Sequence, residues 1–199
     1  MRCARVGTTS LVFEASMFAG DRLLVTVELV YVFADPATQT KRAVPPALRA
    51  MIEHFEAGGE MVELRVGDWA TLGRDATALR TAVFVQEQGI APEIELDALD
   101  ATAVHAVAYN RLGLPVATGR LLQDAPGEAR IGRMAVDRVL RGQRWGRMVL
   151  DALVQAARAR GDVQVTLHAQ CSAEAFYRRA GFEAVGQPYE EAGIAHITM

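Results

Sequence analysis

A short stretch rich in glycine and arginine directly precedes an apolar run of the chain. "RGQRWGR" covers residues 141–147, and from Trp145 the apolar residues recur at positions 145, 148, 149, 152, 153, 156 and 157. This spacing predicts an amphipathic helix. Helix N-termini present unpaired N–H groups and partial positive charge, and glycine lets a ligand approach the backbone. The stretch therefore indicates a phosphate or pyrophosphate site, although it also fits an ordinary loop with solvated arginines.

Strands and helices alternate around this loop in an order that bounds the fold. Residues 129–136 precede the loop and predict a strand, and residues 144–160 predict the helix that follows it. The remaining strands are predicted at residues 61–67, 103–109, 114–122, 163–169, 182–189 and 195–199, and the remaining helices at 68–86 and 172–180. This mixture predicts an α/β (α+β) domain with a mixed sheet.

The first 60 residues have a different pattern of predicted elements, with strands first and one helix after them. Residues 2–34 are rich in Val, Leu and Phe and break at Ala19-Gly20-Asp21, which predicts a hairpin. A short helix is predicted between Pro45-Pro46 and Gly58-Gly59. We expect an N-terminal segment at 1–57, a linker at 58–60 and a second domain at 61–199. Because the apolar strand 24–33 would aggregate if left bare, we expect it to pack on the second domain or to form a homodimer.

Composition narrows the class of protein. The chain has 199 residues with a formal net charge of -3, 51% apolar and 23% charged residues. This balance argues against a general nucleic-acid partner, which would show a basic stripe. No apolar run reaches the roughly 18 to 20 residues of a membrane span, and the N-terminus lacks a signal peptide. The two cysteines form no CxxC pair, which argues against structural zinc. We expect a cytoplasmic protein without a metal or a membrane partner.

Several motifs in residues 61–199 carry a family resemblance. They are "LRTAVFVQEQGIAPEIELDALD" (79–100), "GRMAV" (132–136), "LHAQCSAEAFYRRAGF" (167–182) and the ending "EEAGIAHITM". Together they resemble the GNAT acetyltransferases, within them the small bacterial group typified by the ElaA and YjcF proteins. The resemblance implies a GNAT fold, whose mixed, mostly antiparallel central sheet is flanked by helices. The pyrophosphate pattern Q/R-x-x-G-x-G/A of the family falls on residues 141–146, with Arg144 in place of the central glycine.

The resemblance also implies a reaction and a set of site residues. Acetyl-CoA would be the acetyl donor and a small-molecule amine the acceptor, in a direct ternary complex. Tyr177 would serve as the acid beside the CoA sulfur, although it also fits a core tyrosine. The residues expected to bind CoA are Met134, Ala135, Val136, Arg141, Gly142, Gln143, Arg144, Trp145, Gly146, Arg147, Gln170, Ala173 and Phe176.

The base that deprotonates the amine has several candidates. Glu87 falls at the end of the helix 68–86, where it also fits a solvated helix-end charge. His168 shares a strand face with Gln170 and also fits a packing histidine. Asp97, Asp100 and His105 are further candidates, and the acidic loop 93–100 can attract a cationic amine.

The N-terminal segment carries a second resemblance. Residues 5–14, "RVGTTSLVFE", and 32–49, "VFADPATQTKRAVPPALR", resemble the C-terminal half of hotdog-fold acyl-CoA thioesterases of the 4-hydroxybenzoyl-CoA type. In that family the catalytic acid and the central helix belong to the preceding half. The resemblance therefore implies a partial hotdog fold without thioesterase activity. Two alternatives to an acetyltransferase follow, a non-catalytic CoA-binding module and a fragment of a bifunctional thioesterase–acetyltransferase.

Overall fold

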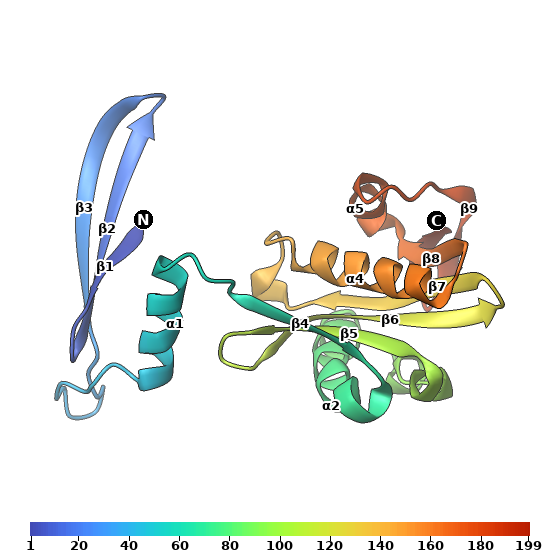
Figure 1. Cartoon of the computed structure of the whole chain (residues 1–199), viewed down its shortest axis with the longest axis horizontal. Helices are drawn as coiled ribbons and strands as arrows, with labels where there is room; N and C mark the ends of the chain where they lie inside the picture. The colour runs from blue at the N-terminus through green and yellow to red at the C-terminus, as the bar shows by residue number, and fades with distance from the viewer. The chain divides into compact units, whose positions relative to one another are not determined.

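The chain forms two compact units, Met1–Met61 and Val62–Met199. The structure is a computed structural model that describes residues 1–199 (Figure 1). No helix has both the length and the apolar character needed to cross a bilayer.

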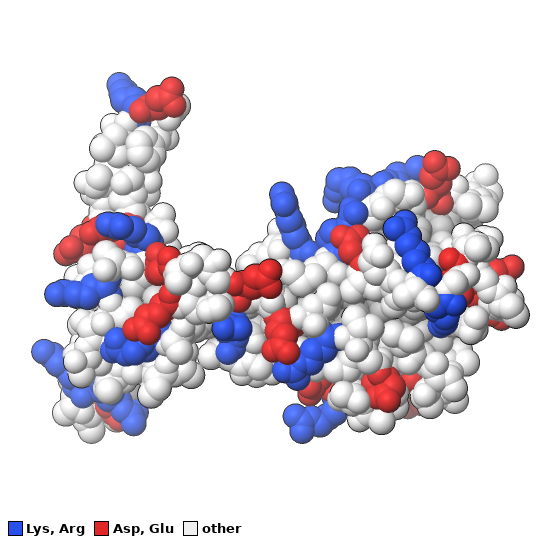
Figure 2. Space-filling view, viewed as in Figure 1, with Lys and Arg blue, Asp and Glu red and all other residues white.

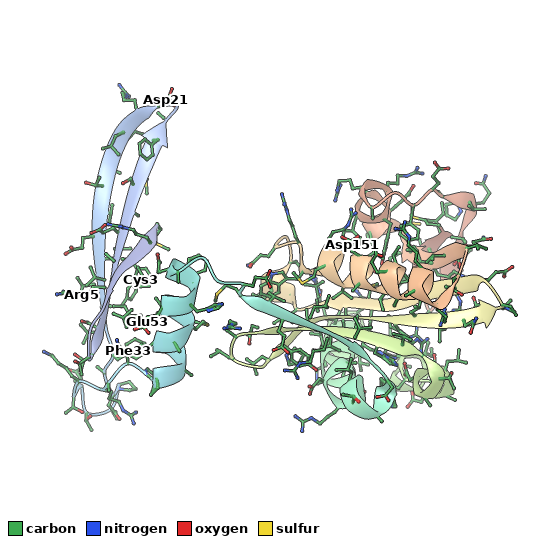
Figure 3. All side chains as sticks on the ribbon, viewed as in Figure 1. Cys3, Arg5, Asp21, Phe33, Glu53 and Asp151 are labelled. Carbon is green, nitrogen blue, oxygen red and sulfur yellow. The ribbon has the colours of Figure 1, made fainter.

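The first unit is a three-stranded antiparallel sheet with one helix. The strands are β1 (Arg2–Val6), β2 (Ser10–Ala19) and β3 (Arg22–Val32), in that order in the sheet, and the helix is α1 (Pro46–Glu56). The predicted hairpin is confirmed, because β2 and β3 pair along their whole length on either side of Gly20, whose φ is 59°. Asp21 lies at the tip of this hairpin (Figure 3).

One face of the hairpin is apolar from end to end. The cross-strand pairs on this face are Leu11–Tyr31, Phe13–Leu29, Ala15–Val27 and Met17–Val25. Met17 and Tyr31 are 59% and 56% exposed. Figure 2 shows charged residues at the hairpin tip and a largely uncharged surface along the stem below it. The partner that covers this face remains a prediction, as does the resemblance to a hotdog fold.

The second unit is built on a seven-stranded sheet in the order β4-β5-β6-β7-β8-β10-β9. The strands are β4 (Val62–Gly67), β5 (Val104–Asn110), β6 (Pro115–Ala125), β7 (Glu128–Val136), β8 (Gln164–Gln170), β9 (Val185–Glu191) and β10 (Ile194–Thr198). Only β7 and β8 run parallel, so the predicted mixed, mostly antiparallel sheet is confirmed.

Two long helices cover opposite faces of this sheet, α2 (Trp69–Arg80) and α4 (Trp145–Arg160) (Figure 1). The alternation along β5 explains both contacts. Ala106 and Ala108 belong to the core cluster under α4, whereas Val107 and Tyr109 belong to the cluster under α2. A strand buried on both faces reads as a nearly continuous apolar run.

The predicted helix 68–86 changes its hydrogen-bond pattern part of the way along. After α2 the chain continues as a π-helix, η1 (Thr81–Glu87), in which Gln88 N–H donates to Val83 C=O at 3.2 Å. Such segments are rare and often lie at functional sites. Short helices complete the unit: α3 (Pro92–Glu95), η2 (Ala98–Thr102), η3 (Arg138–Leu140), η4 (Cys171–Ala173) and α5 (Glu174–Arg179).

Candidate active site

The central feature of the second unit is an opening between β7 and β8. Their parallel pairing runs only from Glu128–Gln164 to Ile131–Leu167. Beyond it, β7 stays paired with β6, and β8 stays paired with β10. The facing edges of residues 132–136 and 168–170 therefore keep backbone groups that a ligand can reach.

A bulge in β7 shapes this opening. Arg133 and Met134 together oppose Gly119 of β6, and Arg133 has a φ of 53°. Gly132, which pairs with Arg120, directly precedes the bulge. A Cβ at Gly119 would lie 2.5 Å from Met134 Sδ and 2.8 Å from Leu153 Cδ1. Sequence reasoning missed Gly119, although a glycine inside a strand pattern is the signal for such a close approach.

A groove of about 920 Å³ lies at the end of this opening and is called the donor cavity here. Of the residues expected to bind CoA, all but Gln143 line it: Met134, Ala135, Val136, Arg141, Gly142, Arg144, Trp145, Gly146, Arg147, Gln170, Ala173 and Phe176. Elements distant in sequence thus bring these residues together, namely the end of β7, the loop before α4 with the first turn of α4, the end of β8, and the short helices η4 and α5.

The loop before α4 has an unusual backbone. Gly142 has a φ of 83°, and Arg144, the N-cap of α4, has a φ of 65°. Only glycine adopts this left-handed conformation without cost, so Arg144 is strained at the position where the family pattern has glycine. A Cβ at Gly146 would lie 3.1 Å from Val136 Cγ2, so the close packing favours a small residue at this position of the pattern.

Two residues predicted for different tasks form an ion pair. Arg141 binds Glu87 through two hydrogen bonds of 2.7 Å each and also donates to the Val136 carbonyl at 3.2 Å. The hydrogen bonds from Arg141 lower the pKa of Glu87. A carboxylate with a lowered pKa is a weaker base. Arg147, in the first turn of α4, pairs with Asp151 one turn further along the same helix (Figure 3).

A second cavity, of about 160 Å³, adjoins the first and is called the acceptor cavity here. Its lining includes Phe84, Ile90, Gly132, His168, Glu191 and His196. The two cavities share Gln88, Met134, Gln170, Ala173 and Tyr177. At this shared wall, Gln170 Nε2 donates to Gln88 Oε1 at 2.9 Å and so links β8 to the end of η1.

Tyr177 lies at the junction of both cavities and is only 8% exposed. Phe176 and Phe182 contact its ring edge-on, with centroids 4.9 and 6.3 Å away. No protein group hydrogen-bonds its hydroxyl, and burial raises its pKa to about 12. The phenol therefore stays protonated at neutral pH and is free to donate to a ligand.

The other predicted bases lie in different surroundings. His168 lines the acceptor cavity, with Nδ1 3.6 Å from Glu191 Oε2. Asp100 and His105 are 2% and 1% exposed, and neither lines a cavity at the junction. His105 Nε2 instead donates to the Asp100 carbonyl at 2.9 Å.

Three carboxylates of the acidic loop predicted to attract an amine, Glu95, Asp97 and Asp100, are paired with arginines. Arg80 binds Glu95 at 2.6 Å and Asp100 at 2.7 Å. Arg120 binds Asp97 and Asp100 at 2.7 and 2.8 Å. Arg133 donates to the Ile94 carbonyl at 2.8 Å and to Asp97 at 3.2 Å. These contacts fasten residues 94–100 to α2, β6 and the bulge of β7, so the loop has a structural task.

Burial and pairing act in opposite directions on these carboxyl groups. Burial by itself would raise the pKa of Asp100, but the hydrogen bonds from Arg80 and Arg120 lower it below its usual range. Burial prevails for Glu95, whose pKa is raised in spite of Arg133 and Arg80.

Comparison with known proteins agrees with this architecture. A model of the acetyltransferase (GNAT) domain matches residues 75–199. An uncharacterised N-acetyltransferase of Bacillus subtilis, YjcF, is 33% identical over 128 residues, which are 63% of this chain and 89% of YjcF. The crystal structure of an acyl-CoA N-acyltransferase from Pseudomonas aeruginosa is 34% identical and has a TM-score of 0.62, covering 69% of this chain and 97% of that one. Escherichia coli ElaA is 28% identical with a TM-score of 0.62, covering 69% and 98%.

Proposed function

Because this chain belongs to the GNAT acetyltransferase family and is an N-acetyltransferase, we propose that it transfers the acetyl group of acetyl-CoA directly to the amine of a small molecule. The observation that carries the proposal is the meeting of the two cavities at Tyr177. Donor and acceptor then bind side by side and react without a covalent enzyme intermediate.

The donor cavity fits the parts of CoA. Its volume lies within the range of ligand pockets. The glycine- and arginine-rich loop at the N-terminus of α4 suits a pyrophosphate, whose charge Arg141, Arg144 and Arg147 would balance. The open edge of β7 at Met134 and Val136 offers backbone groups to the amides of pantetheine, as a sheet edge binds a peptide. Bound acetyl-CoA supplies an activated thioester at the junction.

Tyr177 is our proposal for the group that assists the leaving sulfur. Its hydroxyl donates a hydrogen bond to the thiolate and passes its proton to it. A thiol ordinarily has a lower pKa than a phenol. Burial disfavours the thiolate anion, so loss of water from the junction when acetyl-CoA binds would raise the basicity of the leaving sulfur and favour the transfer.

Other predictions retain a place as alternatives. A CoA-binding module without turnover is favoured by one observation, the strained Arg144 in the loop. Glu87 and His168 stay predictions for the base, and the ion pair with Arg141 counts against Glu87. The partial hotdog segment and a homodimer through its apolar face also stay predictions.

Thermal unfolding with acetyl-CoA, ATP and NAD tests the donor site. Acetyl-CoA at 100 times its dissociation constant adds roughly 2.7 kcal/mol, which raises the Tm by very roughly 5 to 11 °C for a chain of this size. A shift specific to acetyl-CoA supports the proposal. An equal shift with ATP points to a generic anion site, and no shift contradicts a CoA site.

Thiol release from acetyl-CoA then tests turnover with a panel of phenylethylamine, glucosamine, spermidine and trialanine. Tyr177→Phe should lower kcat by roughly 10²- to 10⁴-fold and leave the Tm with acetyl-CoA unchanged. Tyr109→Phe is the matched control, because Tyr109 packs in the cluster under α2 and lines neither cavity. Its hydroxyl donates to Asp75 at 2.9 Å. Acetyl-CoA binding with no thiol release for any amine favours the non-catalytic module.

A further inference from the structure

We propose that His196, on β10, is the general base that takes the proton from the acceptor amine. This inference rests on the acetyl transfer proposed above. It goes beyond the candidates that the sequence offered, since the ending "EEAGIAHITM" entered only as part of a family resemblance.

His196 stands next to the junction of the two cavities. It pairs directly across the strands with Gln170, which lines both cavities. Directly opposed residues of antiparallel strands have Cβ atoms roughly 4.5 to 5.5 Å apart. His196 itself lines the acceptor cavity together with Tyr177. A single acceptor in this cavity can therefore contact both an imidazole and a phenol.

The hydrogen bonding of the ring leaves the correct nitrogen available. His196 Nδ1 lies 2.8 Å from the carbonyl oxygen of Ile194. A carbonyl only accepts, so Nδ1 carries the hydrogen and the neutral ring has its lone pair on Nε2. The ring of Tyr189 stacks on the imidazole at an interplanar angle of 25° and a centroid distance of 6.2 Å. The backbone bond and the stacked ring fix the tautomer and the ring plane.

The competing bases are held less favourably. Both carboxylate oxygens of Glu87 accept hydrogen bonds from Arg141. His168 has a side chain that is 43% exposed, and its Nδ1 lies 3.6 Å from Glu191, which is too far for a hydrogen bond. Only His196 combines partial burial, a fixed tautomer and a place in the acceptor cavity.

The proposed step balances in atoms and protons. The free amine attacks the thioester carbon, a C–N bond forms, and Nε2 of His196 removes one N–H proton. The C–S bond then breaks, and the sulfur takes the hydroxyl proton of Tyr177. Water returns the proton from His196 to the phenolate of Tyr177. The sum moves one proton from nitrogen to sulfur and releases CoA as the thiol.

Several titratable or charged groups share the wall with His196, and they bear on its pH dependence. They are His168 on β8, Tyr189 and Glu191 on β9, Arg130 and Arg133 on β7, Arg120 on β6, Glu95 on α3 and Tyr177 on α5. Arg130 is paired with Asp124 through hydrogen bonds of 2.8 and 3.0 Å. His168 is the other imidazole that lines the acceptor cavity, so it is the necessary control.

The first test measures thiol release against pH in the whole chain, with the most rapidly acetylated amine of the panel as probe. His196→Asn should lower kcat/KM by roughly 10²- to 10⁴-fold and remove the limb of the profile that reports the base. The asparagine amide can still donate to the Ile194 carbonyl, which preserves the strand end. His168→Asn should keep the limb. A wild-type profile in His196→Asn, or loss of the limb in His168→Asn alone, overturns the proposal.

The second test needs no turnover. Histidine ¹⁵N chemical shifts report which ring nitrogen carries the hydrogen, and we expect the Nδ1–H form for His196 at a pH where the ring is neutral. The Nε2–H form would overturn the proposal. Failure of the proposed function looks different, because it abolishes the acetyl-CoA-specific Tm shift in the wild type, whereas His196→Asn should keep that shift.

Discussion

Two groups of three arginines, one beside each cavity, differ in their burial and in their carboxylate partners. The group beside the acceptor cavity is Arg80, Arg120 and Arg133, and the group beside the donor cavity is Arg141, Arg144 and Arg147. In the first group, Arg80 is 1% exposed and bound to two carboxylates. In the second, the side chains of Arg141 and Arg147 are more than 40% exposed, at 43% and 42%.

The difference separates arginines with a structural role from arginines that we propose bind the pyrophosphate of CoA. The buried arginines bind fixed carboxylate partners, and these ion pairs hold residues 94–100 in place. The loop arginines face Glu87 and Asp151 at the surface, and a bound phosphate can replace such partners at little cost. Residue type alone does not distinguish the groups, but the position of the partner carboxylates does.

The largest effect should come from breaking the buried group. Arg80→Met leaves Glu95 and Asp100 without their main partner, and loss of one member of a buried pair costs about 3 to 5 kcal/mol. Urea unfolding measures this loss. Arg74→Met is the control, because its side chain is 95% exposed and should change stability by less than about 0.5 kcal/mol. Equal effects of the two changes would erase the distinction between buried and exposed arginines.

The buried group should also respond to pH through His105. Burial, opposed by the hydrogen bond to the Asp100 carbonyl, lowers the pKa of His105. Below about pH 6.5 the imidazole of His105 is therefore protonated in the unfolded chain, whereas in the folded chain it stays neutral to a lower pH. Stability is therefore full above this pH and falls below it, by at most about 1.4 kcal/mol per pH unit. Unfolding titrations of the wild type and His105→Gln measure the slope, which the variant should lose.

The loop group makes a prediction of opposite sign. Arg144→Gly should raise the free energy of unfolding by about 1 kcal/mol, because glycine adopts a φ of 65° without strain. Arg147→Gly should lower it by about 1 kcal/mol, because that position is helical. Denaturant unfolding of both variants decides the matter. Destabilisation by Arg144→Gly would mean that its side-chain contacts outweigh backbone strain.

The smallest expected effect is on CoA affinity, when Arg141 exchanges its partner Glu87 for a phosphate of CoA. Glu87→Gln frees Arg141 for phosphate and should tighten CoA binding by less than about 10-fold, or about 1.4 kcal/mol. Calorimetric titration measures the affinity, and Glu63→Gln, which breaks a similar exposed pair with Arg65, is the control. Weaker CoA binding by Glu87→Gln would show that Glu87 holds Arg141 in its binding position.

The sequence predicted the order of elements in the second unit because each has a clear period, as in α4. It missed features that depend on contacts distant in sequence. The π-helix at 81–87 keeps the apolar pattern of an α-helix, so only hydrogen bonds reveal it. The partners of Arg80 lie 15 and 20 residues away, and only the folded loop brings them together. His196 was overlooked because the pairing of β10 with β8 is what places it opposite Gln170 and in the acceptor cavity.

The two cavities share a wall in which Gln170 donates a hydrogen bond to Gln88, and this arrangement has a kinetic consequence. In the proposed reaction, donor and acceptor occupy separate cavities that share only this wall, so neither has to leave before the other enters. A dead-end CoA analogue without the sulfur should compete with acetyl-CoA but leave the amine site open. Double-reciprocal plots would then intersect, and initial rates would follow a sequential rather than a ping-pong law.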